Sequence, residues 1–144
     1  YGTGPVGVLP GRFETIDRSR ERLKTDGLRA TARRIAATWF ADGEQASGFP
    51  LCERVGQMAS LEAALDGLPA WENWNVTDRL SDIACPTLIV WGEHDKSYDF
   101  SQPTALKEGI PNSQLSIVPK CAHNVHMEMP TKFNEIVERF LLTQ

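Results

Sequence analysis

The sequence predicts an α/β protein in which helices come first and a small parallel sheet follows. The apolar run Pro86–Gly92 shows no polar–apolar alternation, which is typical of a strand buried on both faces, and Gln114–Pro119 is predicted to be a second buried strand. Between them lies a loop with a short predicted helix, Pro103–Glu108. A strand–helix–strand unit of this kind is expected to pair its strands in parallel through a right-handed crossover.

The first half of the chain is expected to be helical after an opening loop. Tyr1–Gly11 holds four glycines and two prolines, which is loop composition, and helix is predicted from about Glu14. Over Asp26–Phe40 apolar residues recur at steps of three and four, so the helix should bury one stripe of side chains: Leu28, Ala32, Ile35, Ala36 and Trp39.

A breaker segment, Ala41–Pro50, separates that helix from a weaker helical pattern over Leu51–Leu65, which Gly67 and Pro69 should stop. The last helix has the clearest pattern in the chain. Pro130 marks its expected start, and it should dock on the sheet through apolar residues at i, i+3, i+4, i+7 and i+8: Phe133, Ile136, Val137, Phe140 and Leu141.

Composition and charge exclude several classes of function. The 144 residues suit one domain, and the net charge of −4 does not favour binding to nucleic acid. The arginine-rich stretch Arg12–Arg34 contains interleaved acidic residues, which indicates a solvated helical face. No apolar run approaches the ~20 residues of a membrane span, so we expect a soluble protein without a membrane partner.

The cysteines point to a reducing compartment and not to a metal centre. Cys52, Cys85 and Cys121 are an odd, widely spaced set without a CxxC pair, so neither a disulfide scaffold nor a structural zinc site is expected. A site built from Cys121, His123 and His126 would have poor tetrahedral geometry. We therefore expect a cytoplasmic protein with no metal and no cofactor.

Ionisable residues follow both predicted strands, at the edge where ligands collect in open α/β sheets. Asp95 ends the segment GEHD after the first strand, and His123 lies in the segment PKCAHNVH after the second. Loops after neighbouring parallel strands lie side by side, so this acid and this histidine can meet. The pair supplies an orienting carboxylate and a general base, two of the three parts of a nucleophilic relay.

Other residues near these loops have weaker claims. Asp99 lies in the same loop as Asp95 and is the alternative acid. His126 is expected to be structural, because a relay needs one base, and His94 to be a surface residue. Trp39, Trp71 and Trp74 are candidates for lining a substrate site, although Trp71 and Trp74 could instead pack under a loop.

At these residues the chain resembles the C-terminal part of the α/β-hydrolase family. The resemblance covers about Cys85–Leu142 and rests on three segments in the family's order: CPTLIVWGEHD, IPNSQLSIVPKCAHNVHMEMP and FNEIVERFL. It implies that Asp95 is the triad acid and His123 the triad base, and that the HxExP of His126, Glu128 and Pro130 shapes the turn into the last helix. The implied substrate is an ester, a lactone or a related small carbonyl compound.

One part of the family pattern is absent from the sequence. There is no G-x-S-x-G elbow or its Asp or Cys equivalent, and Ser47 and Ser60 lack both flanking glycines and a preceding strand. The resemblance therefore implies a partial α/β-hydrolase fold: residues 1–80 as a helical cap-like segment and residues 81–144 as the C-terminal part of the core.

Two strands make a poor independent sheet, so we expect a partner, either the N-terminal half or a second copy. The alternative is a catalytically inactive fragment or subunit that acts as an interaction module.

Overall fold

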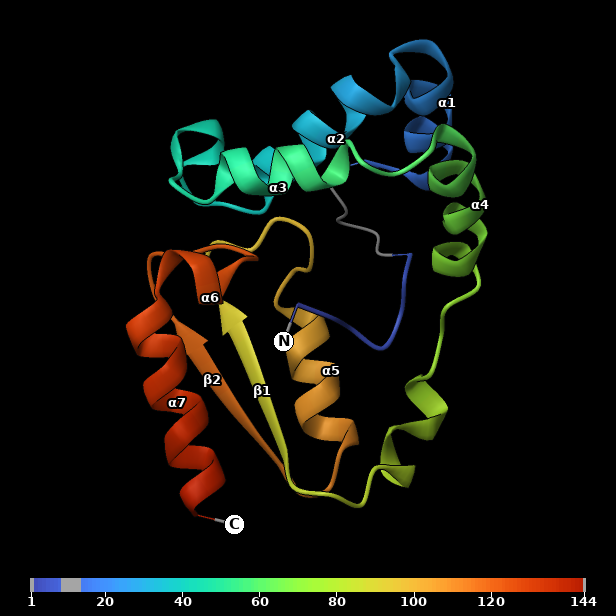
Figure 1. Cartoon of the computed structure of the whole chain (residues 1–144). Coiled ribbons are helices and arrows are strands. Elements are labelled where there is room, and N and C mark those ends of the chain that lie inside the picture. Colours follow the sequence, from blue (N-terminus) through green and yellow to red (C-terminus); the bar gives the residue numbers. More distant parts are fainter. Residues whose placement is uncertain (1, 9–13, 144) are drawn as a thin grey trace.

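The computed structural model describes residues 2–8 and 14–143 (Figure 1). The predictions for Tyr1, for Arg12 and for the rest of residues 9–13 lie outside this part of the chain. In sequence order the elements are α1 (Ile16–Thr25), α2 (Gly27–Thr38), η1 (Gly43–Gln45), α3 (Phe49–Gly56), α4 (Leu61–Glu72), η2 (Thr77–Asp82), β1 (Thr87–Gly92), α5 (Ser101–Gly109), β2 (Ser113–Val118), α6 (Val125–Glu128) and α7 (Pro130–Leu142).

The two predicted strands form a parallel sheet. Partners run in register from Thr87 with Ser113 to Gly92 with Val118, so both strands end at the same edge. Helix α5 makes the crossover, and Figure 1 shows α5 and α7 flanking the strands. Ile136 of α7 packs into one cluster with Val90, Val118, Cys121 and Val125, which confirms that the last helix docks on the sheet. Leu141, the last residue of the predicted stripe, is 65% exposed, so the prediction is wrong for this residue.

The prediction that β2 is buried on both faces is wrong. Ile117 is 49% exposed and Gln114 is also exposed, whereas Val118 is buried in the cluster beneath α7. Within the described residues β1 is the one strand that pairs with β2, so the other edge of β2 has no neighbour in the sheet. The apolar run predicted the position of the strand correctly, but among the described residues only part of the strand is buried by other side chains.

Helices α1 to α4 form a segment, here called the helical segment (Ile16–Glu72), that lies beyond the ends of both strands (Figure 1). Thr15 caps α1, because its hydroxyl accepts a hydrogen bond from the Arg18 N–H at 3.2 Å. Ile16, Leu23 and Leu68 join α1 to α4 in one apolar cluster. Among residues 2–8 and 14–143, no helix has the length and apolar character needed to cross a bilayer.

The predicted helix over Leu51–Leu65 is in fact two helices. Helix α3 ends at Gly56, and Ser60 starts α4 because its hydroxyl accepts a hydrogen bond from the Ala63 N–H at 3.0 Å. The expected stop at Gly67 and Pro69 is also wrong, since α4 continues to Glu72. Burial of Leu68 between these two helix breakers supplies the packing that outweighs their low propensity.

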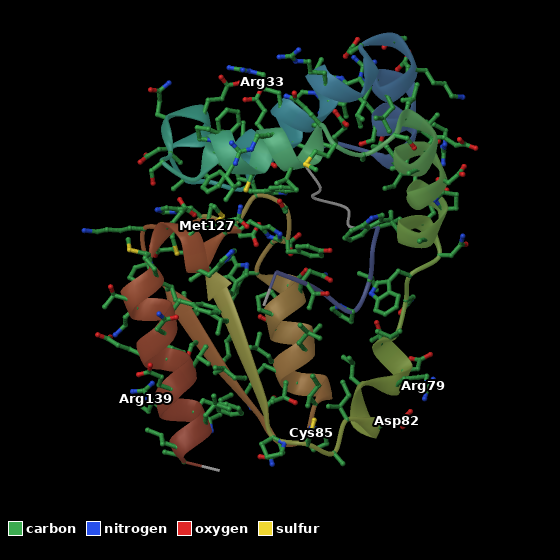
Figure 2. The ribbon with its side chains drawn as sticks, viewed as in Figure 1. Arg33, Arg79, Asp82, Cys85, Met127 and Arg139 are labelled. Atoms are coloured by element: carbon green, nitrogen blue, oxygen red, sulfur yellow. The ribbon has the colours of Figure 1, made fainter. Side chains whose placement is uncertain are left out.

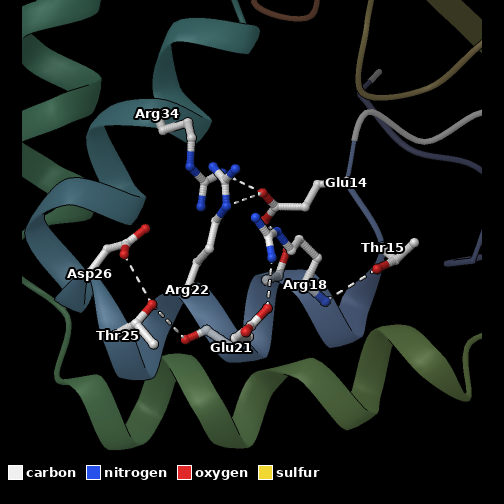
Figure 3. A network of polar contacts seen from close by, with 9 residues as sticks. Glu14, Thr15, Arg18, Glu21, Arg22, Thr25, Asp26 and Arg34 are labelled. Atoms are coloured by element: carbon white, nitrogen blue, oxygen red, sulfur yellow. Dashed lines mark hydrogen bonds and ion pairs between the residues drawn. The ribbon is translucent and has the colours of Figure 1, made fainter.

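The arginine-rich stretch is only partly a solvated face. Glu14 is buried, and Arg22 and Arg34 converge on its Oε2 from two helices at 3.5 and 2.8 Å (Figure 3). Its other oxygen accepts a hydrogen bond from the buried Ser19 hydroxyl at 2.6 Å. Arg18, by contrast, pairs with Glu21 on the surface, as expected. The buried carboxylate of Glu14 therefore links α1 to α2 through two cations, one from each helix.

Candidate active site

Asp95 and His123 meet at the carboxyl ends of the two strands, as the sequence predicts. Asp95 Oδ2 lies 2.9 Å from His123 Nδ1. The Asp95 side chain is 3% exposed and that of His123 is 16% exposed, so the contact is largely shielded from water. When Nδ1 carries the proton, it donates to the carboxylate, and Nε2 is left with a lone pair that can take a proton from another group.

Backbone N–H groups hold the Asp95 carboxylate in place. Its Oδ1 accepts hydrogen bonds from the N–H of Ser97 at 2.7 Å and of Tyr98 at 3.1 Å, and Asp95 N–H in turn donates to the Gly92 carbonyl at 3.0 Å. One carboxylate oxygen is therefore fixed by the loop while the other faces the imidazole. This is the orienting arrangement that an acid–base pair needs.

The loop after β1 is bound directly to the loop after β2. His94 N–H donates to the Cys121 carbonyl at 2.9 Å, and Glu93 N–H donates to the Val118 carbonyl at 3.0 Å. Gly92 allows this approach, because a Cβ built there would lie 2.0 Å from the Ala122 carbonyl oxygen. The loops that carry the acid and the base are therefore held directly against each other.

Aromatic rings and a glycine surround the His123 imidazole. The Tyr98 ring stacks on it with centroids 5.8 Å apart, and the Trp39 ring lies 6.2 Å away. Gly2, at a φ of +64°, approaches the Cε1–Nε2 side of the ring, where an added Cβ would lie 3.3 Å from Cε1 and 3.4 Å from Nε2. Positive φ and close approach together favour glycine at this position.

His123 also lines a cavity of about 360 Å³ between the helical segment and the loops that follow β1 and β2. Trp39 and Trp71, two of the three tryptophans predicted to line a substrate site, are in the wall of this cavity. Trp74 is not among the lining residues; its indole N–H donates to the Gly4 carbonyl at 3.0 Å.

The predicted apolar stripe of α2 is less buried than expected, because Leu28, Ile35 and Trp39 face this cavity. Only Ala36 of the stripe is buried outright.

The remaining candidate residues lie away from the relay. Asp99 is exposed, and its Oδ1 accepts a hydrogen bond from the Ser101 N–H at 2.8 Å, so it is Asp95 that reaches the histidine. His126 is exposed and its ring meets the Phe133 ring edge-on, while burial, and then the charge of His123, lower its pKa. The His94 side chain is 52% exposed.

Cys121 is fully buried beside the base, and its thiol is held in the neutral form. Burial, and then the charges of Glu128, Glu93 and Asp95, raise the pKa of this thiol to about 11. A neutral thiol is a poor nucleophile and a poor metal ligand. Among the residues that the structure describes, no cluster of three or more His, Cys, Asp or Glu side chains could hold a metal ion.

Sequence reasoning missed two residues of the site. Tyr98 was not a candidate, and the aromatic residue three positions after Asp95 was the only signal that could have found it. Glu128 was assigned to the turn before α7, but its carboxylate also accepts a hydrogen bond from the Ala122 N–H at 2.7 Å, directly beside the base. Only the folded loop reveals that contact.

An acid and a histidine in contact at the ends of parallel strands, facing a cavity roofed by helices, are features of hydrolases built on an α/β sheet. The chain belongs to the alpha/beta hydrolase family, to which residues 2–136 match. Its fold class is that of this family, with helices and a small parallel sheet.

Named relatives and solved structures agree with this assignment. A putative 2-succinyl-6-hydroxy-2,4-cyclohexadiene-1-carboxylate synthase of Bacillus subtilis is 33% identical over 93% of this chain and 54% of its own length. A 2-hydroxy-6-oxononadienedioate/2-hydroxy-6-oxononatrienedioate hydrolase of Pseudomonas putida is 41% identical over 44% of this chain and 22% of its own length.

The esterase of Exiguobacterium antarcticum superposes with a TM-score of 0.79 at 19% identity, over 94% of this chain and 55% of that one. The chain thus spans about half the length, or less, of the proteins that it matches.

Proposed function

We propose that this chain supplies the acid, the base and much of the substrate cavity of a hydrolase that cleaves an ester, a lactone or a related small carbonyl compound. The observation that carries the proposal is the 2.9 Å contact between Asp95 and His123 at the wall of the cavity. The nucleophile would come from residues outside this sequence, since the sequence has no nucleophile elbow. The helical segment would act as the cap over the substrate.

In this proposal His123 Nε2 takes the proton of the nucleophile as it attacks the substrate carbonyl, and later returns a proton to the leaving group. Asp95 stabilises the imidazolium that forms in between and fixes the tautomer with its proton on Nδ1. Water then releases the acyl group by the same proton transfers in reverse order.

The walls of the cavity favour a small and uncharged substrate. Its volume of about 360 Å³ is near the lower end of the range for small-molecule pockets. Among the described residues that line it, none is a lysine, arginine, aspartate or glutamate, and the large apolar side chains in the wall come mainly from α1, α2 and α4. Burial of apolar substrate surface would supply most of the binding free energy.

The free edge of β1 supports a preceding half of the same protein as the partner. Within the described residues β2 is the one strand that pairs with β1. A groove of about 240 Å³ lies along β1, lined by its residues Thr87–Trp91 and by Leu106 and Ile110. An unpaired strand edge beside an apolar groove is suited to accept another strand.

Complementation tests the proposed function directly. Hydrolysis of a p-nitrophenyl ester is expected only when this chain is combined with the preceding half that carries the nucleophile, in one polypeptide or by mixing. Each piece alone should leave the ester intact, because a base without a nucleophile gives little acceleration. Activity in neither the mixture nor the joined protein would favour the inactive interaction module, and dimers of this chain alone would point to self-association.

The tryptophans provide a matched pair of variants. Trp71→Ala should lower kcat/KM in the joined protein by about tenfold, because an indole in the cavity wall loses its apolar contact with substrate. Trp74→Ala is the control, since its indole is similarly exposed, 47% against 44%, but does not line the cavity. Steady-state kinetics on one ester measures both, and equal losses would contradict the proposed position of the substrate.

A further inference from the structure

The carboxylate of Glu128 joins two segments that lie far apart in the sequence. Its Oε2 accepts a hydrogen bond from the N–H of Ala122 at 2.7 Å, and its Oε1 accepts one from the N–H of Ala41 at 2.8 Å. Ala122 immediately precedes the base His123, and Ala41 follows the end of α2 by three residues. Hydrogen bonds to an ionised carboxylate are stronger than those between neutral groups.

Further contacts tie the same two regions together. Asn124 N–H donates to the Trp39 carbonyl at 3.0 Å, on the other side of the base. Figure 2 shows Met127 of α6 beneath the helical segment, and its sulfur accepts from the Cys52 thiol at 3.7 Å. His123 is therefore flanked by two residues, Ala122 and Asn124, whose N–H groups are bound to Glu128 and to the helical segment.

The geometry of these contacts sets the distance between the base and the cavity wall. Trp39 lines the cavity, and its ring lies 6.2 Å from the imidazole. Its backbone carbonyl accepts a hydrogen bond from Asn124 in the loop that carries His123, here called the histidine loop. Asp95 fixes the ring of His123, but its carboxylate binds Ser97, Tyr98 and His123, none of which belongs to the helical segment, so it does not set that distance. A displacement of about 1 Å between base and substrate can cost roughly 100-fold in rate.

We propose that Glu128 is a positioning residue that locks the helical segment to the histidine loop, so that the base and the substrate wall keep one geometry. This inference rests on the proposed function and adds a role for a side chain that touches neither Asp95 nor the substrate cavity. Without the two hydrogen bonds of Glu128, the helical segment could move relative to the base.

Glu128→Gln in the full-length protein tests this role. The glutamine carbonyl still accepts one hydrogen bond, but its NH₂ group then faces the other N–H, donor against donor. Glu135→Gln is the matched control, because Glu135 is an exposed acid of α7 that pairs only on the surface, with Lys132. Glu128→Asp, which keeps the charge but shortens the side chain, serves as a second variant if the first folds poorly.

Two measurements separate positioning from simple stability. Amide hydrogen exchange at Ala41 and Ala122 should accelerate by about tenfold in Glu128→Gln and not in Glu135→Gln, since a hydrogen bond to a charged group is lost. The kcat per active site, counted by burst titration, should fall by about tenfold, whereas mere destabilisation would lower the number of active sites and leave kcat per site unchanged.

Unchanged exchange at both amides, or a kcat per site equal to that of the control, would overturn the inference. A wild-type protein that hydrolyses no ester would refute the proposed function instead. In that case the exchange of the two amides would still decide whether Glu128 joins the two segments.

Discussion

Replacing Asp95 with asparagine in the full-length protein is expected to lower kcat by about 10,000-fold with little effect on folding. Asparagine is isosteric, so its carbonyl can still accept the N–H groups of Ser97 and Tyr98. Its NH₂ group, however, would donate to His123 Nδ1 and move the ring proton to Nε2. An imidazole protonated on Nε2 cannot accept the proton of a nucleophile.

Asp99→Asn is the matched control for this prediction. Asp99 lies in the same loop and was the alternative acid, but its carboxylate binds Ser101 and is exposed. We expect its replacement to change kcat by less than about twofold, because the Asp99 side chain is exposed and does not contact His123. Single-turnover kinetics, with thermal unfolding as a check on the fold, would compare the two. A large loss in Asp99→Asn together with a small one in Asp95→Asn would reverse the assignment of the acid.

The core of this site could be predicted from the sequence because its signals are local. Each apolar run is short and is followed at once by its ionisable residue, so Asp95 and His123 needed only the parallel pairing of their strands to meet. That pairing follows from the helix between them. No long-range packing had to be inferred, and the observed contact is the one expected.

The helical segment was harder to predict because long-range contacts decide its details. Helix α4 continues through Gly67 and Pro69 since Leu68 packs against α1, which no local pattern shows. Helix α2 has the same apolar periodicity whether its apolar face packs in a core or lines a cavity, so periodicity alone could not distinguish these two positions. Glu128 accepts hydrogen bonds from Ala41, which is 87 positions away in the sequence, and from Ala122, which is six positions away. Both contacts form only in the completed fold.

A small residue at the end of β1 is expected to be critical for the structure. Gly92→Ala is expected to lower the free energy of unfolding by about 3 kcal/mol, at the upper end of the usual cost of overpacking. The new methyl group would lie 2.0 Å from the Ala122 carbonyl oxygen and 2.8 Å from that of Cys121. Both are backbone atoms, so a change of side-chain rotamer cannot relieve the clash. The loop that carries His123 must therefore shift away from β1.

That shift would also separate the acid from the base, because the two loops are bound together directly after Gly92. Gly92→Ala should therefore lose activity under conditions where it is still folded. Gly67→Ala is the control: apart from its chain neighbours and the backbone of its own helix, no described atom lies within 4 Å of the added methyl, and alanine in a helix interior should stabilise the protein by up to about 1 kcal/mol. Urea denaturation of both variants gives the comparison, and a Gly92→Ala protein as stable as the wild type would contradict the close approach of the two loops on which the site depends.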